Sequence, residues 1–101
     1  MDAYEFAGGT AVVTGAASGI GAALAGLLAA RGSNLVLVDR DKERLDGVAD
    51  GLRRAHPRLA VDTYVVDLSD ASATDEAAET LAAAHPGTTL VVNNAGVALG
   101  G

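Results

Sequence analysis

The sequence has no cysteine, few aromatic residues and few basic ones. Without cysteine it can form no disulfide, no thiolate metal site and no cysteine nucleophile. Aromatic residues make up only 3% of the chain, so its core must be aliphatic. Seven basic residues stand against 13 acidic ones, giving a net charge of -6. With no run of Lys or Arg, the chain is not expected to bind nucleic acid or a membrane surface.

The 101 residues suffice for one domain of ordinary size, which excludes separate cofactor and substrate domains. Half of the residues are hydrophobic and 20% are charged, with 13 glycines and 2 prolines. This composition is typical of a folded globular protein. The absence of cysteine favours a cytoplasmic location.

A stretch without charge runs from residue 7 to residue 30 and is long enough to cross a bilayer. Its threonines, serine and repeated glycines make it only modestly hydrophobic. Acidic residues precede it, where a signal peptide would be basic. We therefore expect neither a membrane helix nor a signal peptide, and interpret the stretch as a strand, a glycine turn and a helix.

Short apolar runs alternate with amphipathic patterns along the whole chain. The runs are typical of strands buried on both faces, and the patterns of helices. Four strands are predicted, at residues 11–13, 35–38, 59–66 and 90–92. Three helices are predicted between them: one from the glycine turn to Arg31, one closed by His56 and Pro57, and one from Asp70 to Ala84.

Each predicted helix has one apolar stripe that should face a core. In the first helix the stripe consists of Ile20, Leu24, Leu27 and Leu28. In the second it consists of Leu45, Val48, Ala49 and Leu52. In the third it consists of Ala73, Ala77, Leu81 and Ala84.

Four strands alternating with three helices predict an α/β fold, a parallel sheet with helices on both faces. Right-handed crossovers place the strands in the order 3-2-1-4. The winding direction then reverses between the first and fourth strands, which opens a crevice at their carboxyl ends. Ligands of such folds bind in that crevice, so the residues just after each strand are the candidates for a site.

Three glycines, Gly15, Gly19 and Gly21, follow the first strand and open the first helix. One suits a tight turn, one lets the backbone approach a pyrophosphate, and one allows close packing of helix on strand. The free amides at the helix start, at the positive end of its dipole, would hold the anion. The alternative is a glycine turn that only eases packing.

Asp39 follows the second strand, twenty positions beyond Gly19, where a carboxylate would accept hydrogen bonds from an adenosine ribose. The alternative is that Asp39 only caps the second helix. Arg40 could pair with the 2'-phosphate of NADP. Asp39 opposes this, because two like unit charges about 4 Å apart repel by roughly 4 kcal/mol at an effective dielectric of about 20. Ser18 supplies no second cation, so NAD is favoured over NADP and Arg40 is interpreted as a solvated surface residue.

Polar residues also follow the third and fourth strands. Asp67 and Leu68 suit the amino edge and the face of an adenine. In Asn93-Asn94-Ala95-Gly96, the amides and small residues would let a ribose lie close to the backbone. Turn chemistry is the alternative for both segments.

In order and spacing, these segments resemble the amino-terminal half of the short-chain dehydrogenase/reductase family. The segments are Thr14-Gly15-x-x-x-Gly19-Ile20-Gly21, Asp39, Asp67-Leu68 and Asn93-Asn94-Ala95-Gly96. The resemblance covers about residues 7 to 96. It implies a Rossmann-type domain that binds a nicotinamide dinucleotide and transfers hydride to or from a carbonyl or alcohol substrate. For the complete protein it also implies a homo-oligomer.

The resemblance assigns a role to each candidate residue. Gly15, Ser18, Gly19, Ile20 and Gly21 would line the diphosphate, and Asp39, with Arg40 beside it, would contact the adenosine ribose. Asp67 and Leu68 would contact the adenine, and Asn94, Ala95 and Gly96 the second ribose.

The sequence departs from the family's pattern in two places. Thr89 stands four positions before the Asn pair, where the family often has an acidic residue. The family's catalytic Tyr, followed four positions later by a Lys, is missing, because Tyr4 is followed at that spacing by Gly8 and Tyr64 by Leu68. In the family that Tyr is the general acid or base and the Lys lowers its pKa.

We therefore predict no catalytic residue in this chain. We interpret residues 1–101 as the amino-terminal part of a single dinucleotide-binding domain, with the catalytic half absent. Two alternatives are a stand-alone nucleotide-binding module without catalysis and a methyltransferase-like nucleoside binder.

Overall fold

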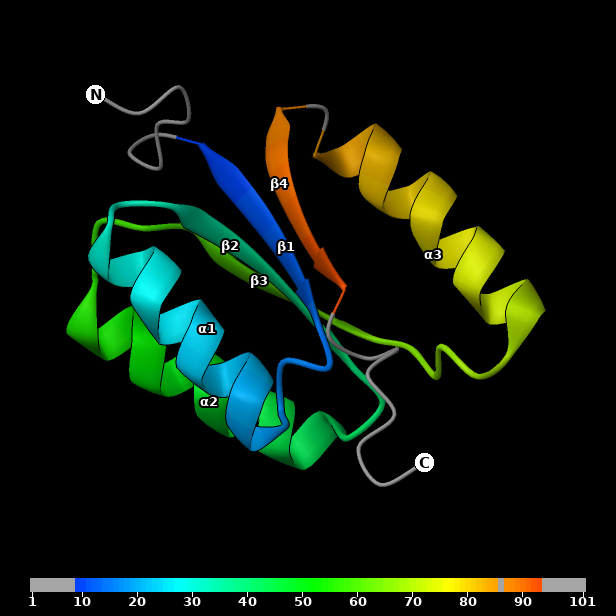
Figure 1. Cartoon of the computed structure of the whole chain (residues 1–101), viewed down its shortest axis with the longest axis horizontal. Helices are drawn as coiled ribbons and strands as arrows, with labels where there is room; N and C mark the ends of the chain where they lie inside the picture. The colour runs from blue at the N-terminus through cyan, green and yellow to red at the C-terminus, as the bar shows by residue number, and fades with distance from the viewer. Residues whose placement is uncertain (1–8, 86, 94–101) are drawn as a thin grey trace.

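Four parallel strands and three helices alternate along the chain (Figure 1). The computed structural model describes residues 9–85 and 87–93, apart from the side chains of residues 89 and 93. The strands are β1 (Thr10–Thr14), β2 (Asn34–Asp39), β3 (Val61–Val65) and β4 (Thr88–Asn93). The helices are α1 (Gly19–Ala30), α2 (Lys42–Ala55) and α3 (Ala71–Ala84).

The strands form one parallel sheet in the order β3-β2-β1-β4, which confirms the predicted fold class and strand order. Helices α1 and α2 cover one face of the sheet, and α3 lies on the other (Figure 1). All strands therefore end at the same edge, where the segments that follow them come together. Among the described residues, no helix has the length and apolar character needed to span a bilayer.

The main core lies between the sheet and the pair α1 and α2. Alternate residues of β1 and β2 point into it, and the helices supply mostly small side chains. The fully buried members from the strands are Ala11, Val13, Leu35 and Leu37, and those from the helices include Ala25, Leu45 and Ala49. Among the described residues, this core is aliphatic and contains no aromatic side chain, which agrees with the prediction from composition.

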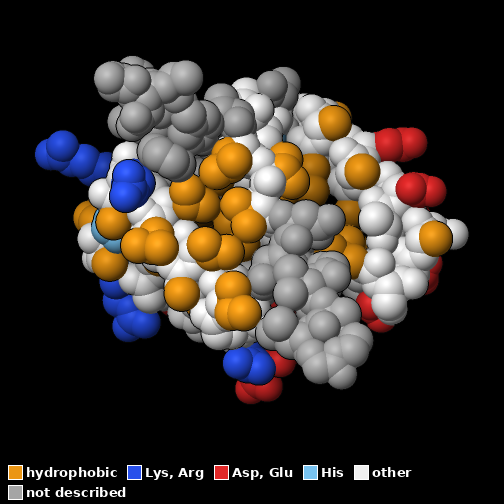
Figure 2. Space-filling view, in the orientation of Figure 1, with side chains coloured by type: hydrophobic (Ala, Val, Ile, Leu, Met, Phe, Trp, Pro, Cys, Tyr) orange, Lys and Arg blue, Asp and Glu red, His pale blue; other side chains and the backbone are white. Residues whose placement is uncertain are grey.

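Only part of the predicted apolar stripe of α1 faces the core: Leu28 is buried and Leu24 is half-buried, but Ile20 and Leu27 are exposed. The buried side of the helix consists of Gly21, Ala25, Leu28 and Ala29. Ile20 is 48% exposed and Leu27 60% exposed. The physical reason is distance: at its first turns α1 lies so close to the turn after β1 that the small residues Gly21 and Ala25 face inward, and Leu28 is the one large side chain of the helix that is buried. Hydrophobic side chains accordingly gather over α1 on the surface (Figure 2).

The second face of the sheet has a thinner cover. Val12, Val36 and Val38 are buried there, with Leu81 of α3 packed against them. Nevertheless, α3 has no fully buried residue. Its predicted inward residues Ala73, Ala77 and Leu81 are half-buried, but Ala84 is exposed, because it is the last residue of the helix. The outer side of α3 is acidic, as Figure 2 shows.

Two polar contacts attach the ends of α3. Thr74 Oγ1 donates to the carbonyl oxygen of Leu68 at 3.1 Å, near the start of the helix. At its end, Tyr64 Oη lies 3.2 Å from His85 Nε2, the histidine that follows the last helical residue. The first contact joins α3 to the loop before it, and the second joins the end of α3 to β3.

Candidate functional site

The turn between β1 and α1 is closed by its own hydrogen bonds. Gly15 has a φ of 65°, in the left-handed region that favours glycine. The hydroxyl of Ser18 donates to the carbonyl oxygen of Gly15 at 2.8 Å, and its oxygen accepts from the Gly21 amide at 3.0 Å. Ser18 is therefore the N-cap of α1, and it holds the turn in a compact form.

The other two glycines of the motif differ in what the fold requires of them. A Cβ added at Gly21 would collide with the carbonyl oxygen of Gly15 and stand 2.8 Å from its carbonyl carbon. Gly21 therefore allows the close approach of α1 to the turn. The sequence predicted close packing of the helix on the strand, and the contact found is with the turn that follows the strand. A Cβ added at Gly19 would meet nothing within 4 Å. The fold alone does not require glycine at position 19, which leaves open space at the start of α1.

The first turn of α1 presents unused hydrogen-bond donors to that space. Among the described residues, nothing accepts the backbone N–H of Gly19 or of Ile20, and both residues are exposed. Such amides, at the positive end of a helix dipole, favour an anion. The arrangement fits a phosphate group of a ligand.

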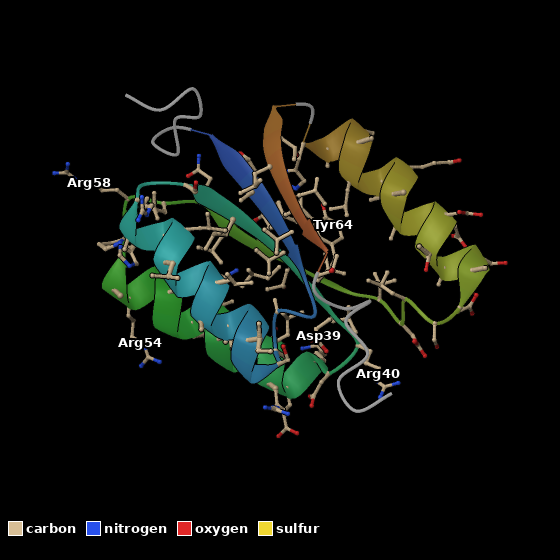
Figure 3. All side chains as sticks on the ribbon, in the orientation of Figure 1. Asp39, Arg40, Arg54, Arg58 and Tyr64 are labelled. Carbon is tan, nitrogen blue, oxygen red and sulfur yellow. The ribbon has the colours of Figure 1, made fainter. Side chains whose placement is uncertain are left out.

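Asp39 lies at the end of β2, beside this turn (Figure 3). Its Oδ2 accepts the amide of Ala17 at 2.9 Å, and its Oδ1 accepts the amide of Asp41 at 3.0 Å. The side chain of Asp41, not that of Asp39, caps α2 by accepting the Arg44 amide at 3.1 Å. The alternative in which Asp39 only caps the second helix is therefore wrong. Its carboxylate joins β2 to the glycine turn.

Asp67 follows β3 at the same edge of the sheet. Its Oδ1 accepts both the hydroxyl of Ser69 at 2.6 Å and the amide of Ser69 at 3.0 Å. The hydroxyl bond, then the amide bond, lowers the pKa of Asp67, and the positive charge of Arg40 lowers this pKa further. Asp67 thus forms a turn, and it remains ionised and exposed at neutral pH. Arg40 is exposed, as predicted, but its charge acts on Asp67.

The structure brings most of the predicted site residues to one edge of the sheet. The residues that lie there after β1, β2 and β3 are Gly15, Ser18, Gly19, Ile20, Gly21, Asp39, Arg40, Asp67 and Leu68. Leu68 is half-buried and packs against the valine cluster of the α3 face. The remaining three, Asn94, Ala95 and Gly96, lie outside the described residues.

Sequence reasoning missed two contacts that shape this edge. The hydroxyl of Thr14 donates to the carbonyl oxygen of Val92 at 3.3 Å, which joins the ends of β1 and β4. Nothing in the pattern around Thr14 indicates this partner, 78 positions away. The turn formed by Asp67 and Ser69 does have a local signature, because an Asp two positions before a Ser favours such a turn.

A hollow lies at the opposite end of the sheet, between the end of α1 and the loop from α2 to β3. It is shallow, with a volume of about 350 Å³, and its lining includes Ala29, His56, Pro57 and Leu59. Among the described side chains, no three of the His, Asp or Glu residues are grouped as a metal site would require. The carboxyl edge therefore remains the candidate site.

A family model described as short chain dehydrogenase matches residues 9–101. The D-threitol dehydrogenase of Mycolicibacterium smegmatis is 39% identical over 98 residues, covering 94% of this chain and 36% of that protein. A metagenomic short-chain oxidoreductase, solved in complex with NADP, has a TM-score of 0.82 and 39% identity over 93% of this chain and 42% of its own. A short-chain dehydrogenase/reductase from Burkholderia phymatum, solved in complex with NAD, has a TM-score of 0.76 and 35% identity. That match covers 87% of this chain and 31% of its own.

Proposed function

Because the chain belongs to the short-chain dehydrogenase family, we propose that it binds a nicotinamide dinucleotide at the carboxyl edge of the sheet. One observation carries the proposal: the Ala17 amide donates to Asp39 Oδ2 at 2.9 Å. This bond places the carboxylate suited to a ribose directly beside the turn suited to a diphosphate. A dinucleotide needs both groups at neighbouring positions.

The proposal assigns each part of the cofactor to residues of the predicted site. The diphosphate would lie at the start of α1, against Gly15, Ser18, Gly19, Ile20 and Gly21. The adenosine ribose would contact Asp39, and the adenine would lie near Asp67 and Leu68. The second ribose would lie near Asn94, Ala95 and Gly96.

We further propose that the chain prefers NAD to NADP. The carboxylate of Asp39 is held by two backbone amides, so it cannot turn away from a 2'-phosphate without breaking those bonds. Arg40, the nearest candidate for pairing with the phosphate, already lies in the field of Asp67. Solved relatives bind one or the other cofactor, so the preference depends on these residues rather than on the family.

Replacing Asp39 with alanine should shift the preference toward NADP. The variant loses the hydrogen bonds to the ribose hydroxyls, which lowers its affinity for NAD by about tenfold. It also loses the repulsion between the carboxylate and the 2'-phosphate, which raises the affinity for NADP relative to that for NAD by about a further tenfold. Calorimetric titration of both cofactors measures the ratio of the two affinities, in which any loss common to both cancels.

Asp41→Ala is the matched control for this change. It removes an acidic side chain two positions away, which caps α2 by accepting the Arg44 amide. The ratio of NAD to NADP affinity should stay close to that of the unchanged protein. If the Asp39→Ala protein had the same ratio of NAD to NADP affinity as the unchanged protein, Asp39 would not face the ribose.

The chain spans about a third of the length of the curated relatives that it matches. The activity we propose for the whole protein is hydride transfer between the nicotinamide and a carbonyl or alcohol carbon, for which the bound cofactor supplies the hydride chemistry. The residues of this chain would bind and orient that cofactor. Homo-oligomer formation and a cytoplasmic location belong to the same proposal.

We infer that the 101-residue chain by itself binds the cofactor without catalysing hydride transfer. It has no Tyr followed four positions later by a Lys to hold and move the substrate proton. Mixed with NADH and a panel of ketones, it should leave the absorbance of NADH unchanged, while a full-length relative oxidises NADH in the same assay. Turnover by purified chain would contradict this inference.

A further inference from the structure

Asp39 faces the glycine turn as well as the proposed ribose site. We propose that Asp39 is a positioning residue for the diphosphate site: its carboxylate fixes the turn between β1 and α1 in the binding conformation before a cofactor arrives. This inference rests on the proposed function, because it treats that turn as the diphosphate site. It adds a role that does not act through the ribose.

The turn is attached to β2 at two consecutive residues. The Ala16 amide donates to the carbonyl oxygen of Val38 at 3.1 Å, and the Ala17 amide donates to Asp39 Oδ2 at 2.9 Å. Ala16 is fully buried and Ala17 is 5% exposed. Among the described residues, Asp39 supplies the one acceptor for the Ala17 amide. Without the carboxylate, this amide is left unsatisfied in a buried position or the turn must open to water.

The carboxylate can act on the turn and on a ribose together. An ionised carboxylate has about four lone-pair positions. Two are used, one on each oxygen, by the amides of Ala17 and Asp41. Two positions remain, which match the two hydroxyls of an adenosine ribose. The bond from Ala17, which holds the turn, and the bond from Asp41 therefore orient the remaining lone pairs.

The position of the turn determines where the backbone amides that would bind the phosphate lie. The unused amides of Gly19 and Ile20 begin two residues after Ala17. Between them, the Ser18 hydroxyl closes the turn by bonding to the Gly15 carbonyl oxygen and the Gly21 amide. The bonds of Ser18 thus hold the shape of the turn, and the Ala16 and Ala17 amides attach the turn to β2. Of the two attachments, the bond from Ala17 is the one that a side chain, that of Asp39, accepts. This contact sets the spacing between the phosphate donors and the ribose acceptor.

Amide hydrogen exchange of the 101-residue protein without ligand tests this role. In Asp39→Ala, the Ala17 amide should exchange about tenfold faster relative to the sheet amides of Val12 and Val36. The Ala16 amide, which bonds to a backbone carbonyl, should keep its relative rate. Asp39→Asn keeps one side-chain oxygen as acceptor and should restore part of the protection. Asp41→Ala should leave the relative rate of Ala17 unchanged.

An unchanged relative rate at Ala17 in both Asp39 variants would overturn the proposal. The comparison with Val12 and Val36 corrects for any general loss of stability, so a destabilised variant still gives a result. Because the exchange is measured without ligand, its outcome does not depend on cofactor binding. If the wild-type protein bound no dinucleotide, the proposed function would be refuted. The exchange rates would still decide whether Asp39 holds the turn between β1 and α1.

Adenosine diphosphate lacking both ribose hydroxyls separates the two roles in binding. If Asp39 acted only through the ribose, Asp39→Ala would bind this probe as well as wild type does, or more tightly, because a negative charge is removed. A positioning role predicts binding about tenfold weaker. Asp41→Ala removes a neighbouring charge without removing the acceptor of Ala17, so it gives the effect of charge alone. If Asp39→Ala and Asp41→Ala both bound this probe more tightly than wild type, and by the same factor, the proposal would be contradicted.

Discussion

Gly21→Ala should lower the free energy of unfolding by about 3 kcal/mol, the upper part of the range for overpacking a close contact. The added Cβ would collide with the carbonyl oxygen of Gly15 and lie 2.8 Å from its carbonyl carbon. Both are backbone atoms, which cannot swing aside as a flexible side chain would. The turn must open, or α1 must move away from the sheet. Urea unfolding followed by circular dichroism measures the loss.

Gly26→Ala is the matched control, in the same helix. A Cβ at position 26 meets nothing within 4 Å, and the residue lies in the interior of α1. Alanine there should raise the free energy of unfolding by about 0.5 to 1 kcal/mol, because glycine loses more conformational entropy in a helix. If the two substitutions changed stability equally, close packing at Gly21 would not be what holds α1 against the turn.

Gly19→Val should abolish detectable dinucleotide binding and leave the fold intact. The space around position 19 is open, so the protein accommodates the side chain. The same side chain occupies the approach to the free amides of Gly19 and Ile20, where the diphosphate would bind. We expect an affinity loss of at least about a hundredfold, corresponding to about 2.7 kcal/mol, in calorimetric titration with NAD.

Gly47→Val is the control for the glycine-to-valine change itself. Gly47 is an exposed residue of α2 with nothing within 4 Å of an added Cβ, and it is not part of the proposed site. This variant should bind NAD as wild type does. If Gly19→Val kept wild-type affinity with a native circular dichroism spectrum, the diphosphate would not lie at the start of α1.

The order of the elements could be predicted because parallel strands leave a simple trace in a sequence. A strand buried on both faces is a continuous apolar run, as in residues 35–38, and the right-handed crossover rule then restricts the strand order. The boundaries were less certain. Strand β3 begins at Val61, two residues later than predicted, because the Leu59 amide still bonds back to His56 in the preceding turn.

The inward side of α1 could not be predicted from hydrophobicity. Of the large apolar residues predicted to face inward only Leu28 is buried, and the rest of the buried side is made of Gly21, Ala25 and Ala29. What decides the orientation is how closely the helix approaches the sheet. That distance depends on the contact between Gly21 and the Gly15 backbone, which hydropathy does not record.

The site was predicted in its location but not in its internal bonds. Strand order alone brings the segments after β1, β2 and β3 to one edge. The sequence does not say which of Asp39 and Asp41 caps α2 and which reaches the turn. That choice depends on the backbone path after β2, which places the carboxylate of Asp39 within reach of Ala17. The effect of Arg40 on Asp67 is likewise a contact between distant segments.

Titration of the 101-residue protein with NAD, followed by the shifts of its backbone amide resonances, tests the central claim most directly. A dinucleotide site at the carboxyl edge predicts saturable shifts at residues 15–21 and at Asp39, with smaller shifts near Asp67. The absence of saturable shifts would contradict the claim. So would shifts confined to the hollow near Ala29 and His56, at the opposite end of the sheet.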